Sequence, residues 1–181
     1  MPRLTPLDPA QLTGEQKQVA DEIAASRGGL RGPFDPWLRS PGLADHAQKL
    51  GGYCRFGSVL PPQLRELAIL LTGKQWKAQF EFWAHARLAR QEGLPEDVIE
   101  AVRAGTTPSF PSEDQRVLYD FVTEYFRANR VSDATYQRAL AAFGERGVVD
   151  LVGTVGYYGL VSMTLNVFDI GLPEGEQPPL D

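Results

Sequence analysis

Hydrophobic residues recur along this chain at the three- and four-residue spacing of amphipathic helices, and no segment alternates as a half-buried strand would. The clearest apolar face consists of Val117, Leu118, Phe121, Val122, Tyr125 and Phe126. Prolines, glycines and capping residues divide the pattern into short segments, as they do at helix ends. The sequence therefore predicts an all-α fold.

The predicted helices cover about 15–26, 41–51 with an extension toward 57, 62–71, 76–92, 95–102, 113–126, 133–143 and 151–168. Capping-box patterns are expected at Thr13 with Gln16, Thr72 with Gln75, and Ser112 with Gln115. Two prolines predict an irregular loop over 30–37. We treat 1–181 as one domain, with C-terminal helices over 112–170 and an extended tail over 171–181.

Composition and charge exclude several classes of protein. The net charge of -5 and the pI near 5.1 provide no basic stripe for phosphates, so no nucleic-acid partner is expected. Residues 151–168 carry no charge and have the length of a short membrane span. Glycines at 153, 156 and 159 favour a closely packed core helix instead, so no membrane partner is expected. Because the N-terminus has no apolar signal segment, we expect a cytoplasmic protein.

Cysteine and histidine usage narrows the possible chemistry further. Cys54 is the single cysteine, which excludes an intrachain disulfide and a thiolate zinc cluster. His46 and His85 are the two histidines, and the carboxylates near them show no metal-ligand spacing. We therefore expect neither a metal nor another cofactor.

The segment 76–85 contains the strongest candidate for chemistry. Glu81 and His85 are four residues apart, which places them one turn apart on a helix. Trp76, Phe80 and Trp83 predict an apolar stripe on the same helix, so the helix and its polar pair are expected to be buried. A buried carboxylate or imidazole requires a partner or a function, because an unpaired buried charge is costly.

Structural roles are the alternative for each of these residues. His85 is also compatible with a structural core histidine, and Glu81 with a simple ion pair to Lys77 one turn earlier. Cys54 suits a buried small hydrophobic residue. The tryptophans suit the core as well as the wall of a substrate pocket.

The stretch from Leu64-Arg65-Glu66-Leu67 through Glu81–His85 to Gly93-Leu94 resembles the carboxymuconolactone decarboxylase family, within the AhpD-like superfamily. The resemblance covers about 35–105 best, which we take as the core of the domain. It implies an AhpD-like multi-helix bundle that assembles as a homotrimer or homohexamer. In the peroxidase branch a Cys-x-x-Cys pair precedes the histidine, and those cysteine positions fall here on Ala78 and Glu81. The decarboxylase branch has Glu-x-x-x-His, which Glu81 and His85 match.

The resemblance implies cofactor-independent acid–base chemistry, decarboxylation or a related proton transfer, on a small carboxylated, ring-derived metabolite. His85 would be the general acid or base, with Glu81 or Glu66 as its partner. Candidate substrate-binding residues are Trp76, Trp83 and Phe34. Two alternatives remain: an AhpD-type alkylhydroperoxidase that uses Cys54, and a non-catalytic oligomeric binding protein on the same fold.

Overall fold

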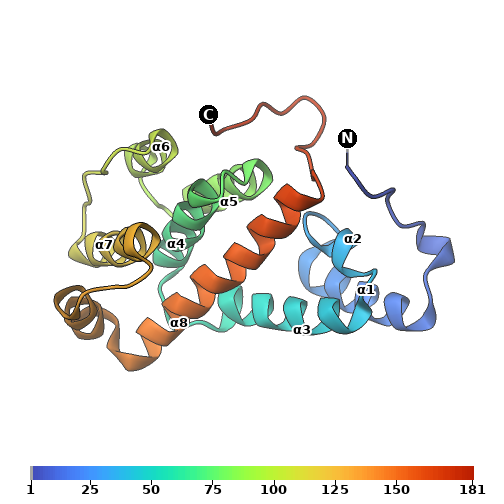
Figure 1. Ribbon diagram of the computed structural model, residues 1–181, viewed down its shortest axis with the longest axis horizontal. Helices are drawn as coiled ribbons and strands as arrows, with labels where there is room; N and C mark the ends of the chain where they lie inside the picture. The colour runs from blue at the N-terminus through green and yellow to red at the C-terminus, as the bar shows by residue number, and fades with distance from the viewer. Residues whose placement is uncertain (1) are drawn as a thin grey trace.

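The computed structural model describes residues 2–181, and this range contains helices and no strand (Figure 1). After a 3-10 turn at Pro9–Gln11, the elements are α1 (Gly14–Arg27), α2 (Phe34–Trp37), α3 (Pro41–Gly52), a π-helical turn η2 (Tyr53–Gly57), α4 (Pro62–Gln75), α5 (Gln79–Gln91), α6 (Glu96–Ala104), α7 (Glu113–Ala128) and α8 (Asp133–Val167). The all-α prediction is confirmed.

Local capping signals explain several of the helix starts. Thr13 and Gln16 form the predicted reciprocal capping box at α1, with each side chain accepting a hydrogen bond from the other residue's backbone N–H. At α7 the Ser112 hydroxyl accepts from the Gln115 N–H, but the Gln115 side chain donates to Gln63 of α4 instead of returning to the cap. The capping box predicted at Ser112 is therefore only half formed.

The junction between α4 and α5 differs from the prediction. Thr72 does not start a helix; its hydroxyl donates to the Ala68 carbonyl oxygen at 2.8 Å, inside α4. The break comes later, where Lys77 adopts a left-handed φ of 50°. Trp76 is thus the C-cap of α4, and the prediction that it shares a stripe with Phe80 and Trp83 on one helix is wrong.

Glycine and proline positions account for two further differences. The helices predicted over 133–143 and 151–168 follow one another as α8, which kinks at Gly144 (φ 66°, ψ 172°), so its second part begins at 145 rather than 151. The loop predicted to be irregular contains the short helix α2 after Pro33. Pro36 is compatible with that helix because a first turn does not use its N–H.

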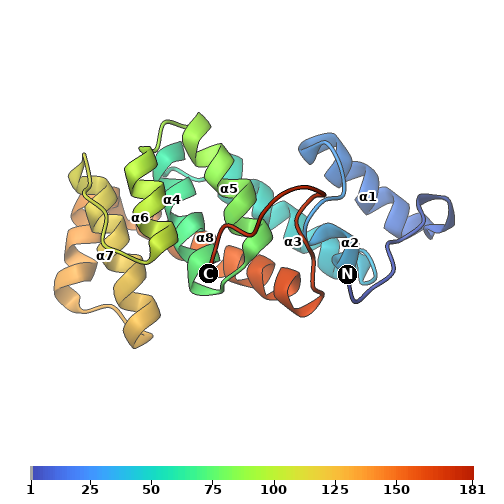
Figure 2. The ribbon, with the colours of Figure 1, turned by 90° about the horizontal axis from the view of Figure 1, so that it is seen from above.

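Two hydrophobic clusters lie on either side of α8, which crosses the front of the molecule (Figures 1 and 2). The first joins α4, α5, α6 and α7 to the middle of α8, and the second joins α1, α2 and α3 to its C-terminal half. Trp37 fixes the second cluster, because its buried indole N–H donates to the Thr164 hydroxyl at 2.9 Å. α8 is therefore the element that holds the two clusters together.

The tail from Gly171 onward has no helix, but its end is anchored to α5. The Gln79 side-chain amide donates to the Leu180 carbonyl oxygen and accepts from the Leu180 N–H, both at 2.9 Å. The Leu180 side chain is buried in the first cluster. Figure 2 shows the tail returning across the molecule to end beside α5. The tail thus holds the first turn of the helix that carries Glu81 and His85.

Candidate active site

A buried imidazole held between two carboxylates forms the centre of the site. α4 and α5 make the most extensive helix contact in the described chain, and this contact brings Glu66 of α4 against His85 of α5. His85 Nδ1 lies 2.7 Å from Glu66 Oε2, and His85 Nε2 lies 2.9 Å from Glu81 Oε1, one turn earlier on α5. The three residues are between 4 and 7 % exposed.

The two carboxylates control the protonation of this imidazole. Burial lowers the pKa of His85, but the negative charges of Glu81 and Glu66 on either side outweigh it and raise the pKa to about 9. At neutral pH the ring is therefore a cation with one carboxylate beside each of its nitrogens. Glu66 fixes the Nδ1 side of the ring through a hydrogen bond, which leaves Nε2 as the nitrogen available for proton transfer.

The contact between Glu81 and His85 is an ion pair without the alignment of a hydrogen bond. Glu81 Oε1 has no hydrogen-bond partner within the described part of the chain, although it is fully buried. A buried carboxylate oxygen without a hydrogen-bond partner is uncommon in native proteins. Its presence calls for an explanation, such as a bound ligand or a catalytic role. Glu81 Oε1 is therefore an acceptor of this site that still lacks a hydrogen-bond donor.

A cavity of about 200 Å³ adjoins the pair. Its wall comes from α1, α2, α5, α8, η2 and the segment before α2. The lining includes Glu81 and His85, the aromatic residues Phe34, Phe80, Trp83, Tyr157 and Tyr158, and the cations Arg27, Arg31 and Arg55. A cavity of this size suits a small ring compound, and apolar walls with a few polar groups are typical of ligand sites.

Three arginines, Arg27, Arg31 and Arg55, give the lining of the cavity positive charge. The Arg27 guanidinium lies 5.2 Å from the centre of the Phe34 ring, and its Nη2 donates to the Gln48 carbonyl oxygen. Arg27 Nε is buried and has no hydrogen-bond partner among the described residues. Guanidinium groups bind carboxylates in forked geometry, so this wall favours an anionic ligand.

Two tyrosines of α8 complete the wall near His85. The Tyr158 ring packs edge-on against the imidazole, with 5.0 Å between ring centres. Burial raises the pKa of Tyr158, and it also raises the pKa of Tyr157. Both phenols therefore keep their protons at neutral pH and are available as hydrogen-bond donors.

Solved structures show what this arrangement of helices is similar to, whereas no protein-family model and no curated protein matches the sequence. A peroxidase-related protein with an alkylhydroperoxidase AhpD core from Ralstonia eutropha JMP134 aligns with a TM-score of 0.80 at 17 % identity, covering 96 % of this chain and 93 % of its own. The protein has the AhpD-like fold. A peroxidase-related protein from Silicibacter sp. TM1040 aligns with a TM-score of 0.77 at 17 % identity, covering 96 % of this chain and 92 % of its own.

A third structure with the AhpD-like fold is the debrominase Bmp8, of which a cysteine-to-alanine variant was solved in complex with 2,3,4-tribromopyrrole. It aligns with a TM-score of 0.75 at 14 % identity, covering 97 % of this chain and 92 % of its own. The names of these neighbours correspond better to the peroxidase alternative than to a decarboxylase, and none of them supports decarboxylation. At 14 to 17 % identity, these structures establish the fold of this chain and not its reaction.

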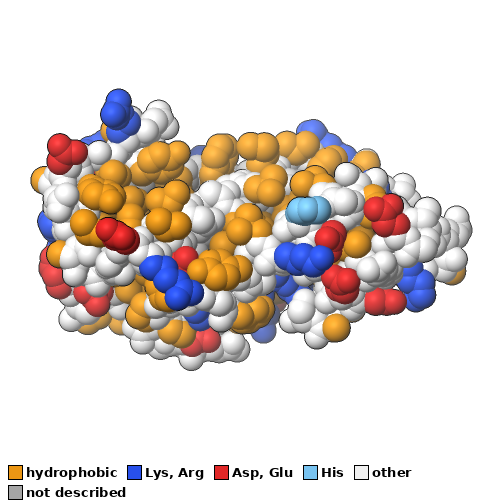
Figure 3. Space-filling view, turned by 90° about the horizontal axis from the view of Figure 1, so that it is seen from below, with side chains coloured by type: hydrophobic (Ala, Val, Ile, Leu, Met, Phe, Trp, Pro, Cys, Tyr) orange, Lys and Arg blue, Asp and Glu red, His pale blue; other side chains and the backbone are white. Residues whose placement is uncertain are grey.

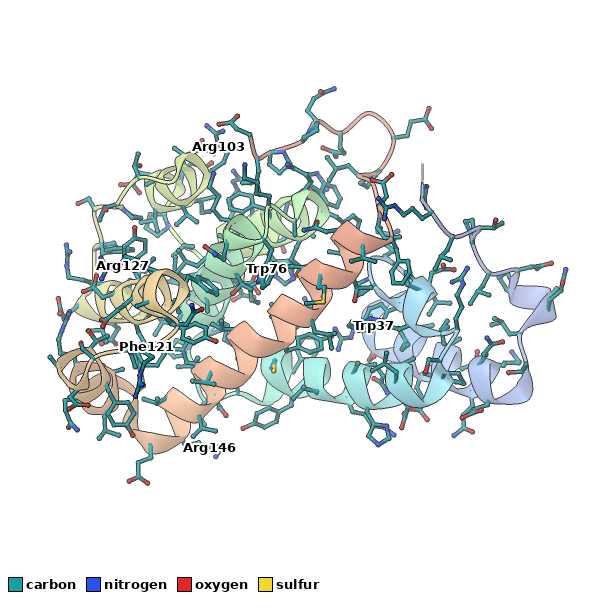
Figure 4. The ribbon with its side chains drawn as sticks, in the orientation of Figure 1. Trp37, Trp76, Arg103, Phe121, Arg127 and Arg146 are labelled. Atoms are coloured by element: carbon teal, nitrogen blue, oxygen red, sulfur yellow. The ribbon has the colours of Figure 1, made fainter. Side chains whose placement is uncertain are left out.

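The structure brings most of the predicted site residues together on this AhpD-like fold. Trp83 and Phe34 line the cavity beside Glu81 and His85, and Glu66 supports His85 from behind. Trp76 does not line it; this residue is 44 % exposed and borders a different groove, next to Phe121 and α8 (Figure 4). The break at Lys77, which comes later along the chain than predicted, separates Trp76 from α5.

The contacts of His85 and Glu81 also bear on the purely structural roles that these two residues could have. The hydrogen bond that a purely structural histidine would make is present, since His85 Nδ1–H donates to Glu66 Oε2. The alternative partner of Glu81 is not: within residues 2–181 its ion pair is with His85 and not with Lys77. Because Lys77 belongs to the break before α5, it is not one helical turn from Glu81.

Sequence reasoning missed the arginines of the cavity. Arg27 ends α1, Arg31 follows it in the connecting segment, and Arg55 lies in η2. They come from separate elements, so no spacing along the chain links them to His85. The one local signal was the concentration of arginine near the glycines at 28 and 29, where α1 ends and the chain turns back.

The surroundings of Cys54 do not favour thiol chemistry. Its side chain is 2 % exposed within the second hydrophobic cluster, and it does not line the cavity. Burial raises the pKa of the Cys54 thiol, whereas a nucleophilic cysteine requires a lowered one. In the described residues, no group of three or more histidine, cysteine or acidic side chains is arranged to hold a metal ion.

Proposed function

We propose that the protein is an enzyme of the AhpD-like fold that catalyses proton transfer on a small anionic ring compound, with decarboxylation as one reaction of this class. The observation that carries this proposal is the buried Glu66–His85–Glu81 arrangement at the wall of a cavity. A histidine cation with one nitrogen fixed by Glu66, and a second carboxylate at the other nitrogen, is equipped to give and receive a proton.

The proton would move between His85 Nε2, Glu81 and a carbon of the substrate. In a decarboxylation, the bond from that carbon to the carboxylate breaks, carbon dioxide leaves, and the electron pair enters the neighbouring carbonyl system as an enolate. Nε2–H then protonates the carbon, which leaves a neutral ring, and a proton taken up from water by way of Glu81 restores the cation for the next turnover. In an isomerisation, Glu81 would remove the proton that His85 later returns elsewhere.

The wall of the cavity supports an anionic, ring-shaped substrate. Arg27, Arg31 and Arg55 supply positive charge, and the unpaired Arg27 Nε offers a donor without a protein acceptor. Phe34 and Trp83 offer ring faces at the same wall. Another protein of the same fold binds a small aromatic ligand: the Bmp8 variant was solved in complex with 2,3,4-tribromopyrrole.

Turnover of a panel of five- and six-membered ring carboxylates that carry a carbonyl or enol group tests the proposal. Proton NMR in deuterium oxide would report both decarboxylation and exchange of a carbon-bound proton. We expect His85→Gln and Glu81→Gln to lower turnover by about 10²-fold or more, the usual size of a general acid–base effect. His46→Gln is the matched control, because His46 is exposed on α3. Full turnover in folded His85→Gln protein would rule the proposal out.

A peroxidase is the second candidate, because two of the structural neighbours are described as peroxidase-related. Cys54 would have to be its nucleophile, with an external thiol to resolve the sulfenic acid, since the chain has no second cysteine. Peroxide consumption with a small dithiol as reductant, measured for the wild type and Cys54→Ser, decides the matter. Activity that disappears with Cys54 would establish the peroxidase; equal rates would eliminate it.

A non-catalytic binding protein on this fold is the third candidate. Its cavity would bind the same anionic ring compounds, so Arg55→Gln would weaken binding measured by calorimetry. His85→Gln would leave bound compounds chemically unchanged, as the wild type does. Proton exchange or product formation in the wild type excludes this candidate.

A further inference from the structure

The outer side of α8 carries an apolar stripe that no other part of the described chain covers. Its side chains are between 36 and 69 % exposed, and they follow the three- and four-residue spacing of one helix face: Val149, Val152, Leu160, Met163 and Val167. Figure 1 shows α8 crossing the front of the molecule with no element over it. In Figure 3, hydrophobic side chains gather along the upper margin and middle of the face, and charged ones lie toward both ends.

Glycines in this stripe have no explanation inside one copy of the chain. Gly153 and Gly156 lie within a continuous helix, where glycine costs about 1 kcal/mol relative to alanine. A Cβ added at either residue would meet nothing within 4 Å. The fold of one copy therefore does not require glycine there. A close approach by a helix from outside does require it, because only small residues let two helix backbones come together.

Four of the five stripe residues are placed symmetrically about Gly156, whereas the fifth, Val167, has the exposed Glu145 at its mirror position. Val152 and Leu160 lie four residues to either side of it, and Val149 and Met163 lie seven residues to either side. The glycines at 153 and 159 lie three residues to either side. Two antiparallel helices that cross on a two-fold axis at Gly156 would bring each position against its mirror position on the partner. Such a self-complementary pattern is what an isologous contact requires.

A groove beside the stripe offers room for the partner's side chains. It has a volume of about 500 Å³, lies between α7 and α8, and is lined by apolar residues that include Trp76, Phe121 and Tyr125. Trp76 and Tyr125 are each 44 % exposed at its rim. Together with the stripe, these exposed side chains present on the order of 600 Å² of apolar surface, close to the roughly 800 Å² that each partner contributes to a standard interface.

We propose that this stripe is a two-fold interface between two copies of the chain, with the α8 helices crossing antiparallel at Gly156. The contact fits a dimer, and it fits the predicted hexamer, which contains two-fold axes; a trimer has none. α8 is also long and apolar enough to cross a membrane by length and composition, but 61 % of that window is buried inside the protein, as in a core helix. A second copy covers the remaining face without moving α8.

Charge substitutions at mirror positions test the proposal by light scattering after gel filtration at tens of micromolar protein. The wild type should have a mass that is an even multiple of 20.0 kDa. V152E and L160K should each halve the mass, because each places two unpaired charges in an apolar contact. The double variant V152E/L160K should recover the wild-type mass, since position 152 of one copy lies against position 160 of the other. L43E is the matched control, because Leu43 is 47 % exposed on α3, away from the stripe.

Recovery in the double variant separates a specific contact from damage to the fold, and far-ultraviolet circular dichroism checks that each single variant stays helical. A monomeric wild type would overturn the proposal, and so would a double variant that stays dissociated. Dissociation by L43E, with V152E unaffected, would place the interface elsewhere and overturn it as well. If the monomeric wild type instead co-sediments with phospholipid vesicles and V152E does not, a membrane is the occupant and the two-fold contact is wrong.

Discussion

The pH dependence of folding should reveal the cation at the centre of the site. His85 has a folded-state pKa of about 9 and an ordinary value of 6.5. Because the folded value lies above the unfolded one, the protonated ring stabilises the fold fully below about pH 6.5. This contribution is lost as the pH rises through about 9. The perturbation is His85→Gln, which removes the titration and keeps an amide between the two carboxylates.

The magnitude follows from the difference between the two pKa values. Each pKa unit corresponds to about 1.36 kcal/mol of differential interaction, so His85 contributes roughly 3 kcal/mol at pH 6. The free energy of unfolding of the wild type, relative to His85→Gln, should therefore fall by roughly 3 kcal/mol between pH 6 and pH 9.5. Glu81→Gln removes the larger of the two carboxylate charge effects and should shrink this fall.

Urea unfolding at a series of pH values, followed by circular dichroism at one fixed protein concentration, measures the effect. His46→Gln serves as the control, since this exposed histidine should leave the profile unchanged. An NMR titration of the His85 ring gives the pKa without any variant. If the ring titrates near 6.5, or if His85→Gln and the wild type lose stability in parallel above pH 7, the two carboxylates do not hold the proton on His85 and the reasoning fails.

Two further predictions concern the packing that positions the site. Gly51→Ala places a Cβ 2.1 Å from the Tyr157 hydroxyl and should lower the free energy of unfolding by about 1–3 kcal/mol, whereas Gly42→Ala, on the same helix with nothing within 4 Å, should not lower it in urea unfolding. Leu180→Ala should cost about 2 kcal/mol or more and speed hydrogen exchange in the first turn of α5, which Gln79 ties to the tail; unchanged exchange there would contradict the anchoring role.

Part of the site could be predicted from the sequence because it depends on one helix. Glu81 and His85 are one turn apart on any helix that contains both, and the apolar residues around them predicted burial. Glu66 was found through the family resemblance, since nothing local relates α4 to α5 across the break. Trp76 was misplaced because a single left-handed residue, Lys77, separates it from the helix of its apolar neighbours.

Local chemistry in the sequence determined where the helices lie: caps such as Thr13, glycine at the α8 kink and the apolar period of α7 act over one or two turns. It also determined the Glu81–His85 pair. Tertiary structure alone decided which nitrogen of His85 faces which carboxylate and how high its pKa rises. It also collected the arginines from three separate segments into one wall. The physical reason is the distance along the chain over which each effect acts. The interactions that start and end a helix join residues a few positions apart, whereas burial and electrostatics depend on groups that only packing brings together.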